Sequence, residues 1–516
     1  MIRKKVLATL LGGSALVFST TAMAQEPPAA QQEPSEPDQS DATADAAIAA
    51  AAPVDDAEAK IELLQAQVEA LQEALEGVKA QMAKATPTWK GGPQLEDKDS
   101  GFSFKPKGFM QFDAGYVGFP NGERRGTLGG LNFANLGFNT RARRIVFGAE
   151  GTLPGGFGYK AEFNFAQGTV DYEDIILTYD FKKSPLQVSI GNFYPYSSLE
   201  TMTSSRLGSM LERASFTDAF NFNRRLGIGV QLSDKKADSY ILQAGLFSQP
   251  INDTSFTRTG WQASLRGVYS PMLGSTRLHV GANFQHRENS RESLAQQYRT
   301  RPLTQITDQR FVDTGNIASK SDNVVGLEFA AIHKSLHVAA EAQKLWTKGT
   351  FTPAQITAFN LVPNTNDTIP SGAVGLNGNP SFTGGYFELG YYLTGETRGY
   401  KGGKWDRTKV LKPFQDGGWG AIQVNGRVDY MDLSDDVDSA ASSVAAPFYV
   451  NGGKQLGLQA SVIWNPIDYL RFMAQFGHVD VTGGPRAAAL DPTSSKPVNK
   501  RKYGVDTAAI RAQLEF

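Results

Sequence analysis

The sequence predicts an all-β fold, a 16-stranded antiparallel transmembrane β-barrel over residues 87–516, with a short N-terminal α-helical coiled coil. Three observations predict it: apolar and polar residues alternate with a period of two after about residue 100, the connections between these segments are short and long in turn, and the chain stops at an aromatic residue, Phe516. The composition agrees, because 53 Gly, 31 Phe and 17 Tyr are typical of many strands and turns. The 0 Cys exclude disulfide scaffolds and thiolate chemistry.

Residues 1–24 have the pattern of a secretory signal peptide. Three bases, Arg3, Lys4 and Lys5, precede the apolar stretch 6–18, and Ala-Met-Ala at 22–24 supplies the small-x-small cleavage site. A membrane-anchored start is the alternative, but the apolar stretch is shorter than the roughly 18 residues that span a bilayer. We therefore expect an exported protein that begins at Gln25 after cleavage.

The next 62 residues form an acidic arm in two parts, with 3 bases against 13 acids over residues 25–86. Residues 25–55, rich in Ala, Pro and Gln, are predicted to be a flexible linker, since they hold too little bulky apolar surface to fold. Residues 56–86 are predicted to form a coiled coil of two or three helices, although a helix that packs on its own chain is an alternative. Apolar residues recur at alternating intervals of 3 and 4 residues, which is the spacing of heptad positions a and d. These residues form the seam of the coiled coil: Ile61, Leu64, Val68, Leu71, Leu75, Val78 and Met82.

From about residue 100 the period changes from 3.5 to 2. In the segment 109–116, Met110, Phe112, Ala114 and Tyr116 share one face, and polar or small residues occupy the other. The same alternation recurs in 144–150, 159–165, 225–230 and 422–430. One face is apolar throughout and the other polar, as lipid on one side and water on the other require.

The connections fall into two groups. Short turns are expected at 154–156, 182–185, 271–274, 333–335 and 465–468. Long loops are expected at 118–139, 193–223, 287–322, 347–383, 432–453 and 481–502. Strands counted between these breaks number 16, a size at which a barrel leaves an aqueous channel. The last strand agrees, because Ile510, Ala512, Leu514 and Phe516 alternate with polar residues. Transport is therefore the leading hypothesis, and the bacterial outer membrane is the expected location, with the coiled coil in the periplasm.

Several blocks resemble the phosphate-selective (O/P-type) porins. They are Arg-Ala-Arg-Arg at 141–144, the run 191–200, Glu212-Arg213, the run 224–227, and the strand and turn of 385–398 with 417–421. The resemblance covers most of residues 100–516. It implies a homotrimer of 16-stranded barrels whose channels are narrowed by infolded loops lined with Arg and Lys, and which pass phosphate or similar small anions by diffusion. It further implies that the loop 193–223, with Tyr194 and Glu200, folds into the channel, and that the basic segment 396–416 does so from the side of the short turns. Tyr194 stands where the family pattern has a lysine.

Anion selection needs fixed cations where a pore is narrow, because they replace part of the hydration of an anion and repel cations. The candidates for this pathway lie at the inward, polar positions of the alternating segments or in the two infolding segments. They are Arg141, Arg144, Lys160, Arg206, Arg213, Arg224, Arg225, Arg266, Arg398, Arg427 and Arg471. Each of these also has a structural alternative, pairing with an acid on the same wall. The predicted inward face indeed mixes eight bases with ten acids, so any anion preference would come from the loops and from local clusters of Arg.

Other kinds of site have little support in the sequence. The cluster Asp432, Asp435, Asp436 and Asp438 offers oxygen ligands for a cation, but a solvated loop explains it as well. We expect no metal, no cofactor, no nucleic acid and no enzymatic activity, because no Ser/His/acid set or nucleotide motif is present. The expected partners are the anionic solutes and the outer-membrane lipid. A second class of function remains, an envelope tether or assembly protein in which the barrel is an anchor and the coiled coil is the functional module.

Overall fold

A computed structural model describes residues 62, 64–76, 88–89, 93–97, 100–120, 136–251, 260–361, 367–435, 445–446, 449–491 and 494–516. The chain divides into two units, Met1–Ala80 and Gln81–Phe516. The predicted signal peptide, the linker and the seam residues Ile61, Val78 and Met82 lie outside the described residues. In the first unit, residues 64–76 are helical, and the seam side chains Leu64, Val68, Leu71 and Leu75 are each more than half exposed. Within the described residues, no helix is long and apolar enough to cross a membrane.

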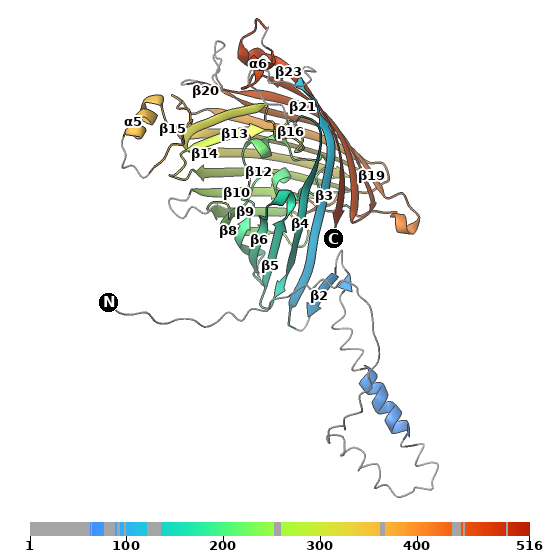
Figure 1. Ribbon diagram of the computed structural model, residues 1–516. Coiled ribbons are helices and arrows are strands. Elements are labelled where there is room, and N and C mark those ends of the chain that lie inside the picture. Colours follow the sequence, from blue (N-terminus) through green and yellow to red (C-terminus); the bar gives the residue numbers. More distant parts are fainter. Residues whose placement is uncertain are drawn as a thin grey trace, which may run out of the picture. The chain divides into compact units, whose positions relative to one another are not determined.

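The second unit is a closed antiparallel barrel of sixteen strands, counted over the described residues (Figure 1). Each strand pairs with the next along the chain, and the last pairs with the first. The predicted fold class is therefore confirmed. The wall consists of β3 (Phe102–Val117), β4 (Gly137–Leu153), β5 (Phe157–Asn164), β6 (Asp171–Asp180), β7 (Leu186–Phe193), β8 (Arg225–Ser233), β9 (Tyr240–Phe247), β10 (Trp261–Tyr269), β12 (Thr276–Glu288), β14 (Val312–His333), β15 (Leu336–Thr350), β16 (Ser381–Tyr392), β19 (Ala421–Asp435), β21 (Tyr449–Ile467), β22 (Leu470–Thr482) and β23 (Lys502–Glu515).

The remaining elements lie in the connections or before the barrel. The short strands are β1 (Thr88–Trp89), β2 (Pro93–Asp97), β11 (Met272–Leu273), β13 (Ala295–Thr300), β17 (Tyr400–Lys401), β18 (Lys404–Trp405) and β20 (Ala445–Ala446). The helices are η2 (Ala166–Gly168), α3 (Leu199–Met202), α4 (Ser215–Ala219), α5 (Pro353–Leu361), η3 (Phe414–Asp416), α6 (Ala487–Leu490) and η4 (Val498–Lys500). None of them interrupts the wall.

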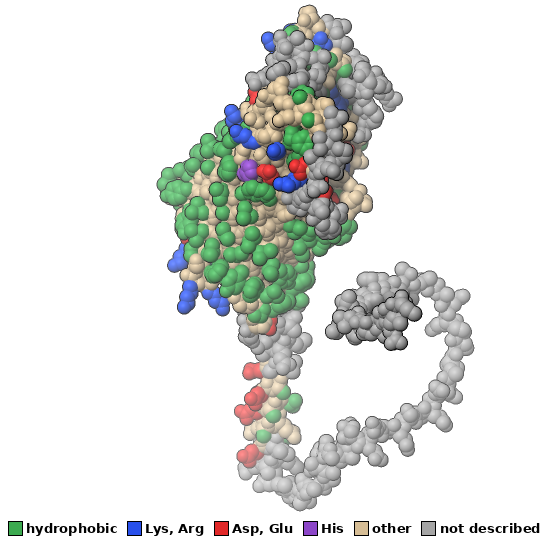
Figure 2. Space-filling view, turned by 90° about the vertical axis from the view of Figure 1, so that its left-hand side faces the viewer, with side chains coloured by type: hydrophobic (Ala, Val, Ile, Leu, Met, Phe, Trp, Pro, Cys, Tyr) green, Lys and Arg blue, Asp and Glu red, His purple; other side chains and the backbone are tan. Residues whose placement is uncertain are grey.

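The alternating side chains of the strands face outward and inward as the sequence predicts. In β3, Phe112 and Tyr116 are 50% and 46% exposed on the outer face, whereas Gln111 and Asp113 point inward and are buried. Hydrophobic side chains cover most of the middle of the outer face drawn in Figure 2, and charged side chains lie above and below them. This distribution matches the hydrocarbon layer of a bilayer with its two polar borders.

The barrel interior departs from the expected polar face on one side. Val324, Val479 and Val481 point inward and are fully buried, and they belong to one apolar cluster with Phe216 and Phe311. The physical reason is that the connections 194–224 and 289–311 fold into the lumen and present aromatic side chains to the wall. The inward face of the barrel wall is therefore open to the lumen only where no infolded connection covers it.

Candidate functional site

The connection 194–224 between β7 and β8 crosses the lumen and is fixed to the wall at many points. Two wall carboxylates accept backbone N–H groups at the helices of this loop: Glu341 from Glu200 at 2.7 Å, and Asp429 from Ser215 at 3.0 Å. An apolar anchor follows, because the ring of Phe216 stacks on that of Tyr386 with centroids 6.3 Å apart. The loop that holds Tyr194 and Glu200 therefore lies against the inner face of the wall.

Three arginines bind the backbone of the same loop, Arg471 and Arg511 from the wall and Arg398 from the connection between β16 and β19. Arg471 donates to the carbonyl oxygen of Arg206 at 2.8 Å, and Arg398 and Arg511 donate to those of Leu207 and Leu211. A carbonyl buried in a lumen must find a donor, and a guanidinium supplies several in a fixed geometry. These arginines therefore hold the loop across the channel.

A second segment enters the lumen from the side of the short turns. Residues 393–420 join β16 to β19, and within them β17 and β18 form a small hairpin with Gly402 and Gly403 at its tip. Both glycines have a positive φ, 60° and 70°, and a Cβ on Gly403 would lie 2.8 Å from Ile241 of the wall. Only glycine allows the hairpin tip to approach the wall this closely at position 403. Arg266 donates to the Gly403 carbonyl at 2.7 Å, which fixes the tip against β10.

The loop and the hairpin meet at a cavity of about 680 Å³, which we call the constriction cavity. Its lining combines bases, acids, hydroxyl groups and a few apolar side chains from both infolded segments and from β3 to β6. The bases are Lys107, Arg143, Arg144, Lys160, Arg206, Arg213, Arg224, Lys401 and Lys404. The acids are Glu162, Asp171, Glu173, Asp174 and Asp406. Bases thus outnumber acids on this lining.

The charges of the constriction cavity are paired unevenly. Lys160 lies 2.6 Å from Asp174, whose other oxygen is 2.5 Å from Arg224, and four more bases also have a carboxylate within 4 Å. Among the described residues, Arg213, Lys401 and Lys404 have no carboxylate oxygen at that distance, and the acids Asp171 and Asp406 have no basic partner. The three bases keep a small excess of positive charge open to the cavity.

Lys404 has an unusual setting in this cavity. Its side chain is open to water in the lumen, yet protein surrounds it closely on the hairpin and on the wall. This desolvation lowers the pKa of Lys404, and the positive charge of Lys160 lowers it further. Lys404 therefore loses its positive charge at a lower pH than an ordinary lysine does.

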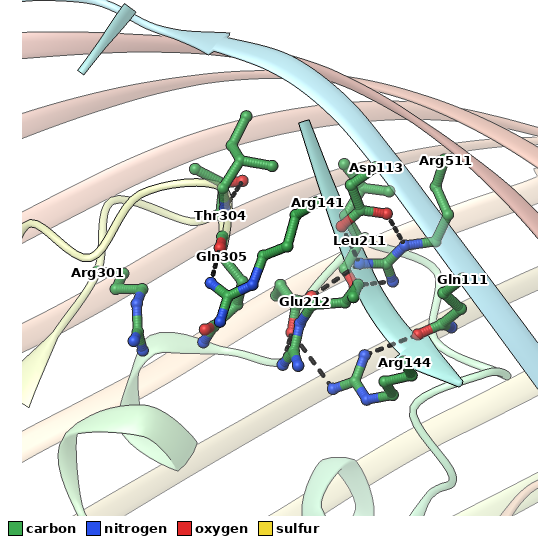
Figure 3. Close-up of polar contacts among 12 residues, drawn as sticks. Gln111, Asp113, Arg141, Arg144, Leu211, Glu212, Arg301, Thr304, Gln305 and Arg511 are labelled. Atoms are coloured by element: carbon green, nitrogen blue, oxygen red, sulfur yellow. Dashed lines mark hydrogen bonds and ion pairs between the residues drawn. The ribbon is translucent and has the colours of Figure 1, made fainter. Parts of the chain in front are cut away.

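Glu212 of the loop lies within 4 Å of three arginines; two of them, Arg144 and Arg511, are labelled beside it in Figure 3. Arg143 lies 2.9 Å from it, Arg511 2.8 Å, and Arg144 3.6 Å. Burial alone would raise the pKa of Glu212, but these guanidinium groups outweigh it and hold the pKa well below its ordinary range. The carboxylate stays charged and ties the loop to the barrel wall.

Comparison with known proteins gives the family. A family model described as "Phosphate-selective porin O and P" matches residues 128–516, well over half of the chain. The chain belongs to this porin family. An uncharacterized protein of Caulobacter vibrioides is 35% identical over 461 residues, which cover 85% of this chain and 81% of the relative. "Porin O" of Pseudomonas aeruginosa is 27% identical over 379 residues, or 67% of this chain and 76% of that one.

Solved structures with a similar fold include the outer-membrane channel DcaP of Acinetobacter baumannii. It is 12% identical, with a TM-score of 0.46, and the match covers 83% of this chain and 100% of DcaP. The family and the barrel together establish the porin as an outer-membrane channel.

The porin brings six of the predicted pathway and loop residues together. Arg144, Lys160, Arg206, Arg213, Arg224 and Tyr194 all line the constriction cavity. Lys107, Arg143, Lys401 and Lys404 line it as well and were not among the predicted site residues. The two hairpin lysines lie in the long basic connection 396–416, which is the signal in the sequence that points to them.

The other predicted residues lie away from this cavity, and each has a partner in the barrel. Arg266 and Arg427 form buried pairs with Glu328 and Glu388, and Arg427 also lies 3.0 Å from Glu200. Arg225 donates to the carbonyl of Ser248 at 3.1 Å. Arg398 and Arg471 bind the loop backbone, as described above. Arg141 binds the carbonyl of Gln305 in the second infolded connection, 289–311 (Figure 3).

The suggested cation cluster near 432–453 is only partly within the described residues. Asp432 lies 2.7 Å from Lys454, and Asp435 accepts the backbone N–H of Ser381, while Asp436 and Asp438 lie outside. Among the described residues, no group of three or more acids or histidines is arranged to hold a metal ion.

Proposed function

We propose that this porin passes small anions, such as phosphate, by passive diffusion. The observation that carries the proposal is the constriction cavity, where Arg213, Lys401 and Lys404 present charges without carboxylate partners among the described residues. An anion that enters a narrow, protein-lined channel loses part of its hydration, and fixed ammonium and guanidinium groups replace it. The pathway arginines that bind the loop backbone act indirectly, because they hold the constriction in place.

Conductance measurement tests this function. The purified full-length porin in planar bilayers, under a tenfold KCl gradient, should give open channels whose reversal potential has the sign of anion preference. Replacing both hairpin lysines by methionine (K401M and K404M) should move the reversal potential toward zero. The matched control is K182M with K183M in an exposed turn, which should leave it unchanged. Cation preference of the unaltered porin would contradict the proposal, and complete absence of conductance would favour the tether.

The porin is further proposed to be a homotrimer held in part by the coiled coil 56–86 in the periplasm. The apolar seam supports this proposal, since Leu64, Val68, Leu71 and Leu75 are exposed in the single chain. Two further copies of the same seam would cover these side chains and give a favourable transfer free energy of roughly 25 cal/mol per Å² of buried apolar surface.

A further inference from the structure

The constriction cavity contains apolar side chains that a simple inorganic anion would not use. Met202 and Leu207 of the loop line it beside the bases, and each is partly exposed to the lumen. Apolar surface exposed to water costs free energy, so a channel for hydrated ions alone would gain from polar residues here. Ligand sites, by contrast, combine apolar side chains with fixed charges that orient the ligand.

Tyr194 fixes the orientation of the bases next to these apolar residues. The guanidinium carbons of Arg224 and Arg213 lie 4.3 and 5.3 Å from the centre of its ring, and Arg213 also donates to the Tyr194 hydroxyl at 3.3 Å. Two loop carbonyls, those of Glu200 and Thr203, accept the other hydrogen bonds of Arg213. Arg213 is thus immobilised without a carboxylate partner and directly beside an aromatic surface.

The size of the cavity supports the same conclusion. Its volume of about 680 Å³ lies within the range of roughly 300–1,000 Å³ that is typical of small-molecule sites. A single phosphate group would leave most of this space to water. A solute with a hydrocarbon body would fill it, with its charge near Arg213 and its apolar part against Met202 and Leu207.

We propose that the constriction cavity favours organic anions that carry an apolar body, and that Met202 and Leu207 of the loop provide this preference. The inference rests on the proposed anion channel and adds a class of solute to it. Carboxylates attached to an aromatic or aliphatic ring are the simplest members of that class.

Channel block by matched carboxylates tests the inference. Benzoate and acetate have the same charge and differ in the ring, so each is added, and then phosphate, to the full-length porin conducting KCl in planar bilayers. We expect half-block at a concentration at least tenfold lower for benzoate than for acetate or phosphate, because a well-placed apolar group commonly changes recognition by about 10-fold or more. The double variant M202Q/L207N should remove most of that difference.

The outcomes separate the inference from the function on which it rests. Equal half-block by the three anions in an anion-selective channel would overturn the inference and leave the porin function intact. A benzoate preference that persists in M202Q/L207N would overturn the assignment to this cavity. M272S, at an exposed turn residue, is the control and should retain the preference. If the double variant does not assemble, M202Q alone, nearly equal in size, replaces it, with the same two outcomes.

Discussion

Arg511 of the last strand and Asp113 of the first barrel strand form a two-pronged ion pair, with Nε and Nη2 at 2.6 and 2.7 Å from the two carboxylate oxygens. The two residues are also direct partners in the β23–β3 register. Arg511 is fully buried and further contacts Glu212 of the infolded loop. The Arg511 side chain thus connects the junction of the last and first barrel strands to the infolded loop.

Removing this arginine should destabilise the barrel. R511M leaves Asp113 buried without its partner, and a broken buried pair costs about 3–5 kcal/mol. Urea unfolding of the porin in lipid vesicles, followed by tryptophan fluorescence, measures the loss. R291M is the control, since Arg291 is 70% exposed and lies 4.0 Å from Asp367; we expect a change within about 0.5 kcal/mol. Equal stability of both variants would show that the pair contributes little.

The apolar anchor of the loop should set the width of the channel. Phe216 is fully buried, and F216A should cost about 3–5 kcal/mol of local packing. The loosened loop would then leave the constriction for part of the time, so single-channel records should show larger and noisier conductance. F138A, at a side chain that is 70% exposed on the outer face, should conduct like the unaltered porin. A steady, unchanged conductance of F216A would contradict this role.

Anion preference should depend on pH through Lys404. A lysine is charged below its pKa, and the pKa of Lys404 is lowered by its protein surroundings and by Lys160. As the pH rises, its charge is therefore lost earlier than that of an ordinary lysine, whose pKa is about 10.4. The reversal potential should shift toward zero over the alkaline range below that value. K404R, which stays charged, should remove the shift, whereas K183R in an exposed turn should not.

The coiled-coil seam should contribute to the oligomer. Charges at two seam positions, L64D and L71D, would place carboxylates in the proposed interface, where their desolvation is costly. We expect fewer trimers by light scattering in detergent. The control Q65D with Q72D adds the same charges one position away, off the seam. Trimers that are equally abundant in both variants would reduce the coil to a spacer, and the same would follow if deletion of residues 56–84 had no effect.

Much of the wall could be predicted from the sequence, because lipid and water impose opposite demands on alternate residues of every strand. The outward exposure of Phe112 and the inward burial of Asp113 are examples of this local rule. The turn at 234–239 was harder to predict, since it has no Gly or Pro and depends on Asp234, which accepts hydrogen bonds from Lys236, Ala237 and Ser239.

The interior could be predicted only in part, because the period of a strand reveals which residues face inward but not what they meet there. Val479 and Val481 meet an apolar cluster that includes aromatic residues from connections distant in the sequence. Arg471 binds a loop carbonyl more than 260 positions away along the chain. The constriction cavity similarly forms where the connections 194–224 and 393–420 meet. The sequence of either connection alone does not reveal that the two lie together.

The run of carbonyls at 206–211 has a consequence for assembly. Its donors come from β22, β23 and the segment before β19, and Arg511 also belongs to the strand that completes the ring. The loop therefore gains its hydrogen bond from Arg511 only when the final strand pairs with the first. Closure of the barrel and positioning of the loop become a single event, so the width of the channel is set when the barrel closes.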